Sequence, residues 1–170
     1  MKAREIRKGV HLLGAVDWNR RLFDSLIPLP DGTSYNAYLV EGSEKTALID
    51  AADPAMEHVL MDQLAQVKEI DYVISLHTEQ DHSGAIPAVL EKYPGAKLLC
   101  SSKAKELLMD HLHIDEGRIR PVDDGEILSL GGKSLQFIYL PWVHWPETMA
   151  AYLPEEKILD FMFFDPGMGI

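Results

Sequence analysis

Cysteine is almost absent from this chain of 170 residues, because Cys100 is the only one. An intramolecular disulfide and a cluster of thiolate metal ligands are therefore both excluded. Cys100 follows Leu98 and Leu99 in an apolar run, where a small buried hydrophobic residue is expected. The composition indicates a protein of the reducing cytoplasm.

Long apolar runs and excess positive charge are also missing. No stretch of about 18 apolar residues occurs, so no membrane-spanning helix is predicted. The N-terminal segment MKAREIRKGV has no apolar core of the kind that signal peptides carry. Sixteen Lys and Arg residues face 27 Asp and Glu residues, and the net charge is -11. This balance argues against nucleic acid and anionic membranes as partners, because both repel an acidic surface.

The pattern along the chain predicts one folding unit, residues 1–170, with a mixed α/β architecture. β-rich runs flank a turn within residues 34–51, and a helix is expected from Asp53-Pro54 onward. The apolar runs at 72–76 and 97–101 are typical of buried strands, and each precedes a helical pattern. Ser83 is expected to cap the first of these helices. Residues 126–140 predict a second hairpin, and residues 150–159 predict two more short strands. Helices covering a sheet are the expected result.

The loop HTEQDH, residues 77–82, places four potential metal ligands directly after a buried strand. In a locally extended segment alternate side chains share a side, so His77, Glu79 and Asp81 are expected to face one way. His82, at the turn into a helix, is expected to return to the same cavity. The loop therefore predicts a site for two adjacent metal ions.

Ligands from elsewhere must complete such a site, and His144 is the best candidate. It lies in LPWVHWPETM, residues 140–149, just after a predicted strand and between two tryptophans. Trp142 and Trp145 would exclude water and hold the imidazole, or would simply pack.

These motifs resemble a known family. H-x-[EH]-x-D-H after a strand is the signature of the metallo-β-lactamase superfamily. Glutamate at Glu79, followed by DHSGA and later by HWPET, resembles the diiron domain of the flavodiiron proteins. GTSYNAYLV at 32–40, KTALIDA at 45–51 and YLPEEKIL at 152–159 match as well, together with Val16-Asp17-Trp18. The resemblance covers about residues 3–159.

The resemblance implies the first half, and the start of the second half, of a metallo-β-lactamase-like αββα sandwich. It implies a non-haem diiron domain that binds and reduces dioxygen or nitric oxide. His77, Glu79 and His144 would hold one iron, and Asp81 and His82 the other. A carboxylate in place of an imidazole makes the site harder and more anionic, which suits iron better than zinc.

The family also has a bridging aspartate after the KIL strand, where this sequence reads DFMFFDPGMGI. The family position falls on Phe163. Asp165, which keeps the expected strand parity, is the preferred candidate for the bridge, and Asp160 is the alternative.

The resemblance implies further parts that lie outside these residues: a last histidine ligand and a flavodoxin domain that binds FMN. Electrons would come from that flavin or from a flavodoxin- or rubredoxin-like donor protein. A second partner chain, a truncated form, a natural remnant and a swapped homo-oligomer all remain open. Two other functions also remain open: a dioxygen-binding sensor module, and a metallo-β-lactamase-type hydrolase that uses a metal-bound hydroxide.

Overall fold

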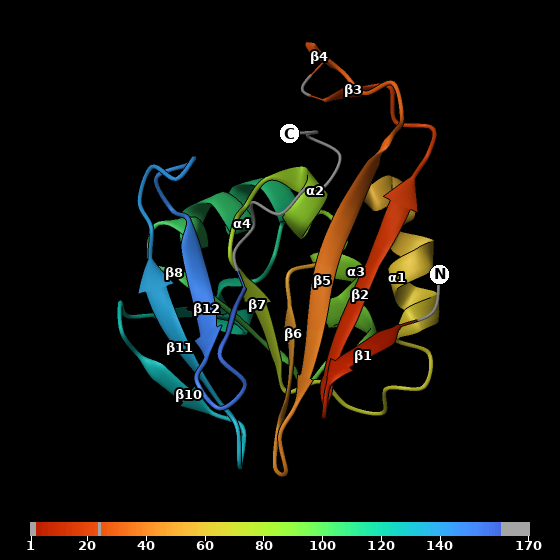
Figure 1. Ribbon diagram of the computed structural model, residues 1–170. Helices are drawn as coiled ribbons and strands as arrows, with labels where there is room; N and C mark the ends of the chain where they lie inside the picture. The colour runs from red at the N-terminus through yellow and green to blue at the C-terminus, as the bar shows by residue number, and fades with distance from the viewer. Residues whose placement is uncertain (1–2, 24, 161–170) are drawn as a thin grey trace.

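The computed structural model describes residues 3–23 and 25–160. Its largest element is a seven-stranded sheet in the order β1-β2-β5-β6-β7-β8-β9 (Figure 1). The bounds are β1 (Arg4–Arg7), β2 (Val10–Asp17), β5 (Thr33–Glu41), β6 (Thr46–Ile49), β7 (Tyr72–Ser75), β8 (Lys97–Ser101) and β9 (Ile119–Val122). Neighbours from β1 to β6 are antiparallel, and those from β6 to β9 are parallel. The parallel half brings the carboxyl ends of β6, β7 and β8 to one edge.

A second sheet faces the first, and helices cover the opposite face (Figure 1). Its strands are β10 (Ile127–Ser129), β11 (Ser134–Tyr139), β12 (Met149–Leu153) and β13 (Ile158–Asp160), all antiparallel. The helical segments are η1 (Pro54–Met56), α1 (Glu57–Gln63), α2 (Gln80–Ser83), α3 (Ile86–Lys92), α4 (Ala104–Leu112) and η2 (Glu116–Arg118). A two-stranded hairpin, β3 (Leu22–Phe23) with β4 (Ile27–Pro28), projects beyond the large sheet.

Strand β7 shows why the central run is apolar at consecutive positions. Val73 packs into the core between the large sheet and the helices, whereas Ile74 packs into the core between the two sheets. Both side chains are fully buried. Because a strand's side chains alternate between faces, a strand covered on both faces needs an unbroken apolar run. Phe137 and Met149 of the second sheet belong to the same core as Ile74.

Most of the sequence predictions are confirmed. The first hairpin is β5 and β6, the apolar runs are β7 and β8, and the second hairpin is β10 and β11. Gly131 and Gly132 form the turn of the second hairpin with φ values of 77° and 71°, a region that favours glycine. The described layers are helices, sheet and sheet, which agree with the expected start of an αββα sandwich.

The prediction that Ser83 caps a helix is wrong. Ser83 is the last residue of the short helix α2, and its hydroxyl donates to the carbonyl groups of Thr78 and Glu79. The segment is divided into two helices, because α2 ends at Ser83 and α3 begins at Ile86, after its N-cap residue Ala85. Strand β9 was not predicted, although its Ile119 and Val122 are buried in the large sheet.

Among the described residues, no helix is long and apolar enough to cross a membrane.

Candidate metal centre

The site is built on the loop that follows β7. Glu79 is the N-cap of α2 and has an extended backbone, with φ −62° and ψ 146°. His77 and Glu79 therefore lie on the same side, as alternation predicts. Asp81 and His82 lie within the helical turn of α2, so the extended pattern expected for Asp81 is wrong beyond Glu79.

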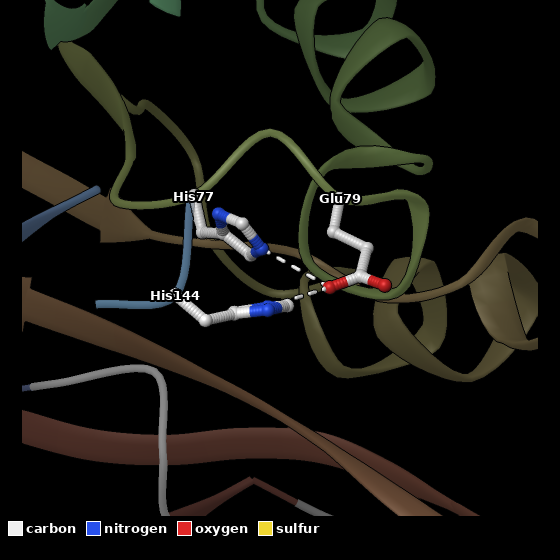
Figure 2. A group of neighbouring side chains, drawn as sticks. All are labelled: His77, Glu79 and His144. Atoms are coloured by element: carbon white, nitrogen blue, oxygen red, sulfur yellow. Dashed lines mark hydrogen bonds and ion pairs between the residues drawn. The ribbon is translucent and has the colours of Figure 1, made fainter. Parts of the chain in front are cut away.

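His77, Glu79 and His144 form the most compact ligand group in the described part of the chain (Figure 2). Oε2 of Glu79 lies 3.1 Å from Nε2 of His77 and 3.1 Å from Nε2 of His144. One ligand atom from each residue lies within 4.8 Å of the others. Metal ions bind nitrogen and oxygen ligands at about 2.0–2.2 Å, which puts neighbouring ligand atoms about 3 Å apart. The spacing fits one shared ion.

The three side chains differ in exposure. His77 is completely buried, the Glu79 side chain is 12% exposed, and the His144 side chain is 41% exposed. The hydrogen bond with His77 lowers the pKa of Glu79 against the opposing effect of burial, and the nearby His144 lowers it further. A carboxylate thus lies between two imidazoles, an arrangement that suits a cation in place of the shared protons.

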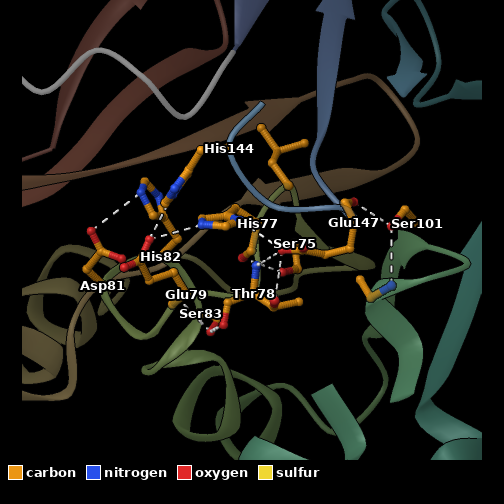
Figure 3. Close-up of polar contacts among 12 residues, drawn as sticks. Ser75, His77, Thr78, Glu79, Asp81, His82, Ser83, Ser101, His144 and Glu147 are labelled. Atoms are coloured by element: carbon orange, nitrogen blue, oxygen red, sulfur yellow. Dashed lines mark hydrogen bonds and ion pairs between the residues drawn. The ribbon is translucent and has the colours of Figure 1, made fainter. Parts of the chain in front are cut away.

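Asp81 and His82 lie beside this group (Figure 3). Nε2 of His82 is 3.6 Å from Oδ2 of Asp81, and the rings of His82 and His77 have centroids 5.7 Å apart. Oδ1 of Asp81 is buried and has no hydrogen-bond partner among the described residues. Burial raises the pKa of Asp81. A buried carboxylate oxygen without a protein donor is unfavourable unless a cation is near, so this pair also fits a metal.

Asp50 is one residue whose contact with the site was not predicted from the sequence. It follows β6, is buried, and accepts a hydrogen bond of 2.8 Å from the backbone NH of Leu76. Its other oxygen lies 3.6 Å from Nδ1 of His82. Burial opposes protonation of His82, but the carboxylates of Asp50 and Asp81 outweigh it and raise the pKa of His82 to about 9. Asp50 therefore connects the end of β7 with a candidate ligand.

Glu147 is the second residue that sequence reasoning missed (Figure 3). Its buried carboxylate lies 2.8 Å from Nδ1 of His77, and it accepts hydrogen bonds from the backbone NH and the hydroxyl of Thr78 at 3.1 and 2.8 Å. Burial would raise the pKa of Glu147, but the hydrogen bonds from His77 and Thr78 lower it to about 2. The signal in the sequence was an acidic residue three positions after His144.

The two tryptophans around His144 have different environments. The Trp145 ring lies edge-on to His77, with the ring centroids 4.9 Å apart, so Trp145 packs against a candidate ligand. Trp142 is 73% exposed, so the prediction that it shields the imidazole is wrong. The Trp142 side chain is exposed to solvent, and its backbone NH donates a hydrogen bond to the carbonyl of Trp145.

Asp165, the preferred candidate for the bridging aspartate, lies outside the described residues. Asp160 is the last residue of β13, and its backbone pairs opposite Ala151.

The chain is similar to known proteins over most of its length. The model of the ODP family beta lactamase matches residues 33–162. The rubredoxin-oxygen oxidoreductase of Megalodesulfovibrio gigas is 40% identical over 162 residues, which are 94% of this chain and 40% of that protein. The nitric oxide reductase of Moorella thermoacetica is 40% identical over 158 residues, 91% of this chain and 39% of that protein.

Solved structures give the same result. The structure of rubredoxin oxygen:oxidoreductase from Desulfovibrio gigas superimposes with a TM-score of 0.87 at 38% identity, covering 93% of this chain and 40% of that one. The flavodiiron protein from Giardia intestinalis superimposes with a TM-score of 0.86 at 30% identity, covering 94% and 39%. The chain thus spans about 40% of the length of these relatives.

Proposed function

This chain belongs to the ODP family of beta-lactamase-like domains found in flavodiiron proteins, and from that premise we propose that it binds two iron ions and acts in reducing dioxygen or nitric oxide. The observation that carries the proposal is the position of Glu79, whose carboxylate oxygen lies at equal distances from the Nε2 atoms of His77 and His144. A carboxylate there favours iron over zinc, because carboxylates are harder ligands than imidazoles.

The proposed ligands divide between two irons. His77, Glu79 and His144 hold one ion, and Asp81 and His82 hold the other. The compact spacing of the first group and the unpartnered oxygen of Asp81 support this division. Asp165 remains the proposed bridge from the sequence, with Asp160 as the alternative.

Two bound irons would supply a place for a diatomic gas and electrons for its reduction. The protein's own side chains determine the environment of that chemistry. Trp145 covers one side of His77 and excludes water there. The carboxylates of Glu79 and Asp81 would compensate the positive charge of the metals, and the hydrogen bond with His77 lowers the pKa of Glu79, which favours its ionised form. Open coordination positions and a mixed histidine and carboxylate set are what non-haem iron chemistry requires.

An electron donor is part of the proposal. Reduction of two nitric oxide molecules to nitrous oxide takes two electrons, and reduction of dioxygen to water takes four. A flavin or a flavodoxin- or rubredoxin-like protein is the proposed source, and the name of the Megalodesulfovibrio gigas relative includes rubredoxin.

We also propose that a homo-oligomer or a second chain completes the protein. Exposed apolar side chains on or near the projecting hairpin support such an association, because a large exposed apolar patch favours contact with another protein surface. Four of these side chains are between 47% and 81% exposed: Trp18, Leu22, Leu26 and Ile27.

The test is anaerobic reconstitution of the purified chain with ferrous iron, followed by counting of bound iron and measurement of nitric oxide and dioxygen consumption under a chemical reductant. We expect bound iron and gas consumption that a His77→Ala variant loses. Reversible gas binding without product would instead favour the dioxygen-binding module. Selective zinc binding with esterase activity would favour the hydrolase. Iron content no higher than that of His77→Ala would overturn the proposal.

A further inference from the structure

The side chain of Glu147 joins two loops that each carry a candidate ligand. Glu147 belongs to the segment between β11 and β12, three positions after His144. Its carboxylate reaches the loop after β7, where it contacts His77 and Thr78 (Figure 3). The backbone carbonyl of Glu147 also accepts a hydrogen bond of 2.6 Å from the hydroxyl of Ser101, at the end of β8. Three separate segments therefore meet at this one residue.

We propose that Glu147 is a positioning residue of the metal centre: it holds the His77 ring so that Nε2 faces Glu79 and His144, and it fixes the spacing between the two loops. This inference rests on the proposed function, because it concerns the same ligands.

The chemistry of imidazole gives the first part of the argument. A neutral imidazole carries one proton, and only the nitrogen without it can bind a metal. The Glu147 carboxylate 2.8 Å from Nδ1 accepts the Nδ1 proton, so Nε2 is the ring nitrogen whose proton a metal ion can replace. Nε2 is the atom that lies 3.1 Å from Glu79. An acceptor on the far side of a ligating histidine also makes the imidazole a stronger donor to metal.

The burial of Glu147 gives the second part. The residue is 1% exposed, and its Oε2 atom has no hydrogen-bond partner among the described residues. A buried carboxylate is costly to desolvate, and an apolar side chain of similar size would pack at lower cost. Among the described residues, the side-chain and backbone donors that other residues supply to this carboxylate come from His77 and Thr78, on the ligand loop. The carboxylate therefore holds the ligand loop in place and does not contribute to the packing of the apolar core.

Glu147→Gln is the variant that tests the inference, because it keeps the size and an acceptor for Thr78 but removes the charge. Glu155→Gln is the matched control. Glu155 likewise accepts hydrogen bonds from the backbone NH and hydroxyl of one residue, Ser134, but it is exposed and lies on the turn between β12 and β13. Affinity for Fe²⁺ and for Co²⁺ is measured anaerobically by competition with a chelator, together with the Co²⁺ absorption spectrum and the melting temperature of the metal-free protein.

We expect Glu147→Gln to weaken metal binding by roughly 10- to 100-fold, the range for a partner of a ligating histidine. We also expect it to alter the Co²⁺ spectrum, while Glu155→Gln matches the wild type. Loss of affinity that follows only from a lower melting temperature, with an unchanged spectrum at saturating Co²⁺, would overturn the inference. So would wild-type affinity in Glu147→Gln, and in that case the proposed function would stand.

A second measurement needs no variant and no metal. Nitrogen-15 NMR of the metal-free wild-type protein reports which ring nitrogen of His77 carries a proton. We expect a proton on Nδ1, and a bare Nδ1 would overturn the inference even if the chain folds and binds iron. If the wild type binds no metal, the proposed function fails, and the NMR result still decides whether Glu147 orients His77.

Discussion

Nε2 of His144 lies 3.1 Å from Oε2 of Glu79, although the two residues are 65 positions apart. The loop between β11 and β12 and the loop after β7 meet at this point because the two sheets pack face to face. The backbone also connects them, since the NH of Met149 donates to the carbonyl of Leu76 at 3.0 Å. The ligand group is therefore a product of the packing of the sheets, and each loop alone supplies only part of it.

Glu79→His should change the metal that the site prefers. The substitution replaces the hard carboxylate by an imidazole and removes a negative charge, so we expect the ratio of bound iron to bound zinc to fall. The ratio is measured by elemental analysis after anaerobic exchange with equal concentrations of both ions. Glu91→His, on the exposed face of α3, is the control for a histidine added elsewhere. An unchanged ratio in Glu79→His would contradict the assignment of Glu79 as an iron ligand.

His144→Ala should separate metal binding from folding. The His144 side chain is 41% exposed on a loop, so its loss should change the free energy of unfolding of the metal-free protein by no more than about 0.5 kcal/mol. Metal affinity should fall by more than the roughly 10- to 100-fold expected for a residue that only supports a ligand. Chemical denaturation and chelator competition measure the two effects, and His58→Ala, on the exposed face of α1, should change neither. A large loss of stability without loss of affinity would show that His144 is structural.

The structural features that the sequence predicted correctly are those whose signal is local. The hairpins follow from turn residues between β-rich runs, and the placement of His77 and Glu79 on one side follows from alternation beyond a buried strand. The role of Glu147 could not be predicted, because it depends on a contact with His77 across 70 positions. No local pattern gives the packing of the second sheet on the first, which sets that contact.

Two of the errors, at Asp81 and Ser83, have local causes. Asp81 was expected to continue the extended alternation, but α2 begins directly after Glu79. Ser83 was expected to cap a helix, but its hydroxyl donates to carbonyl groups instead of accepting from backbone NH groups. In both cases the cause is the short helix α2, which was not predicted from the sequence. A helix of a single turn leaves little periodic signal in a sequence.

Asp50 variants should reveal what its buried carboxylate contributes to stability. Asp50→Ala leaves the backbone NH of Leu76 without its partner, which should lower the free energy of unfolding by about 1–3 kcal/mol. Asp50 also has a φ of 54°, a region in which alanine is strained by about 1–2 kcal/mol and asparagine is tolerated. We expect the loss to be largest for Asp50→Ala, intermediate for Asp50→Gly and smallest for Asp50→Asn, as measured by urea denaturation of the metal-free protein. Equal losses in Asp50→Ala and Asp50→Asn would rule out the hydrogen bond as the cause.

Cys100 should give the protein a measurable loss of stability at alkaline pH. The thiol is fully buried in β8, and burial raises its pKa from 9.0 to about 12. The raised pKa belongs to the folded state, so the contribution of the protonated thiol to stability is complete below pH 9. It is lost as the pH rises from 9 toward 12, because in this range the unfolded chain releases the thiol proton and the folded chain keeps it. One pKa unit corresponds to about 1.4 kcal/mol, so the stability advantage over Cys100→Ala should fall by about 1 kcal/mol between pH 9 and pH 10. Taking the difference between the two proteins cancels the titration of lysines and tyrosines that both share.

Labelling of Cys100 with a thiol reagent under native conditions provides an independent check, and it should proceed only as fast as the protein opens. Rapid labelling, or a difference in stability that does not change with pH, would show that the thiol is accessible to solvent in the folded protein.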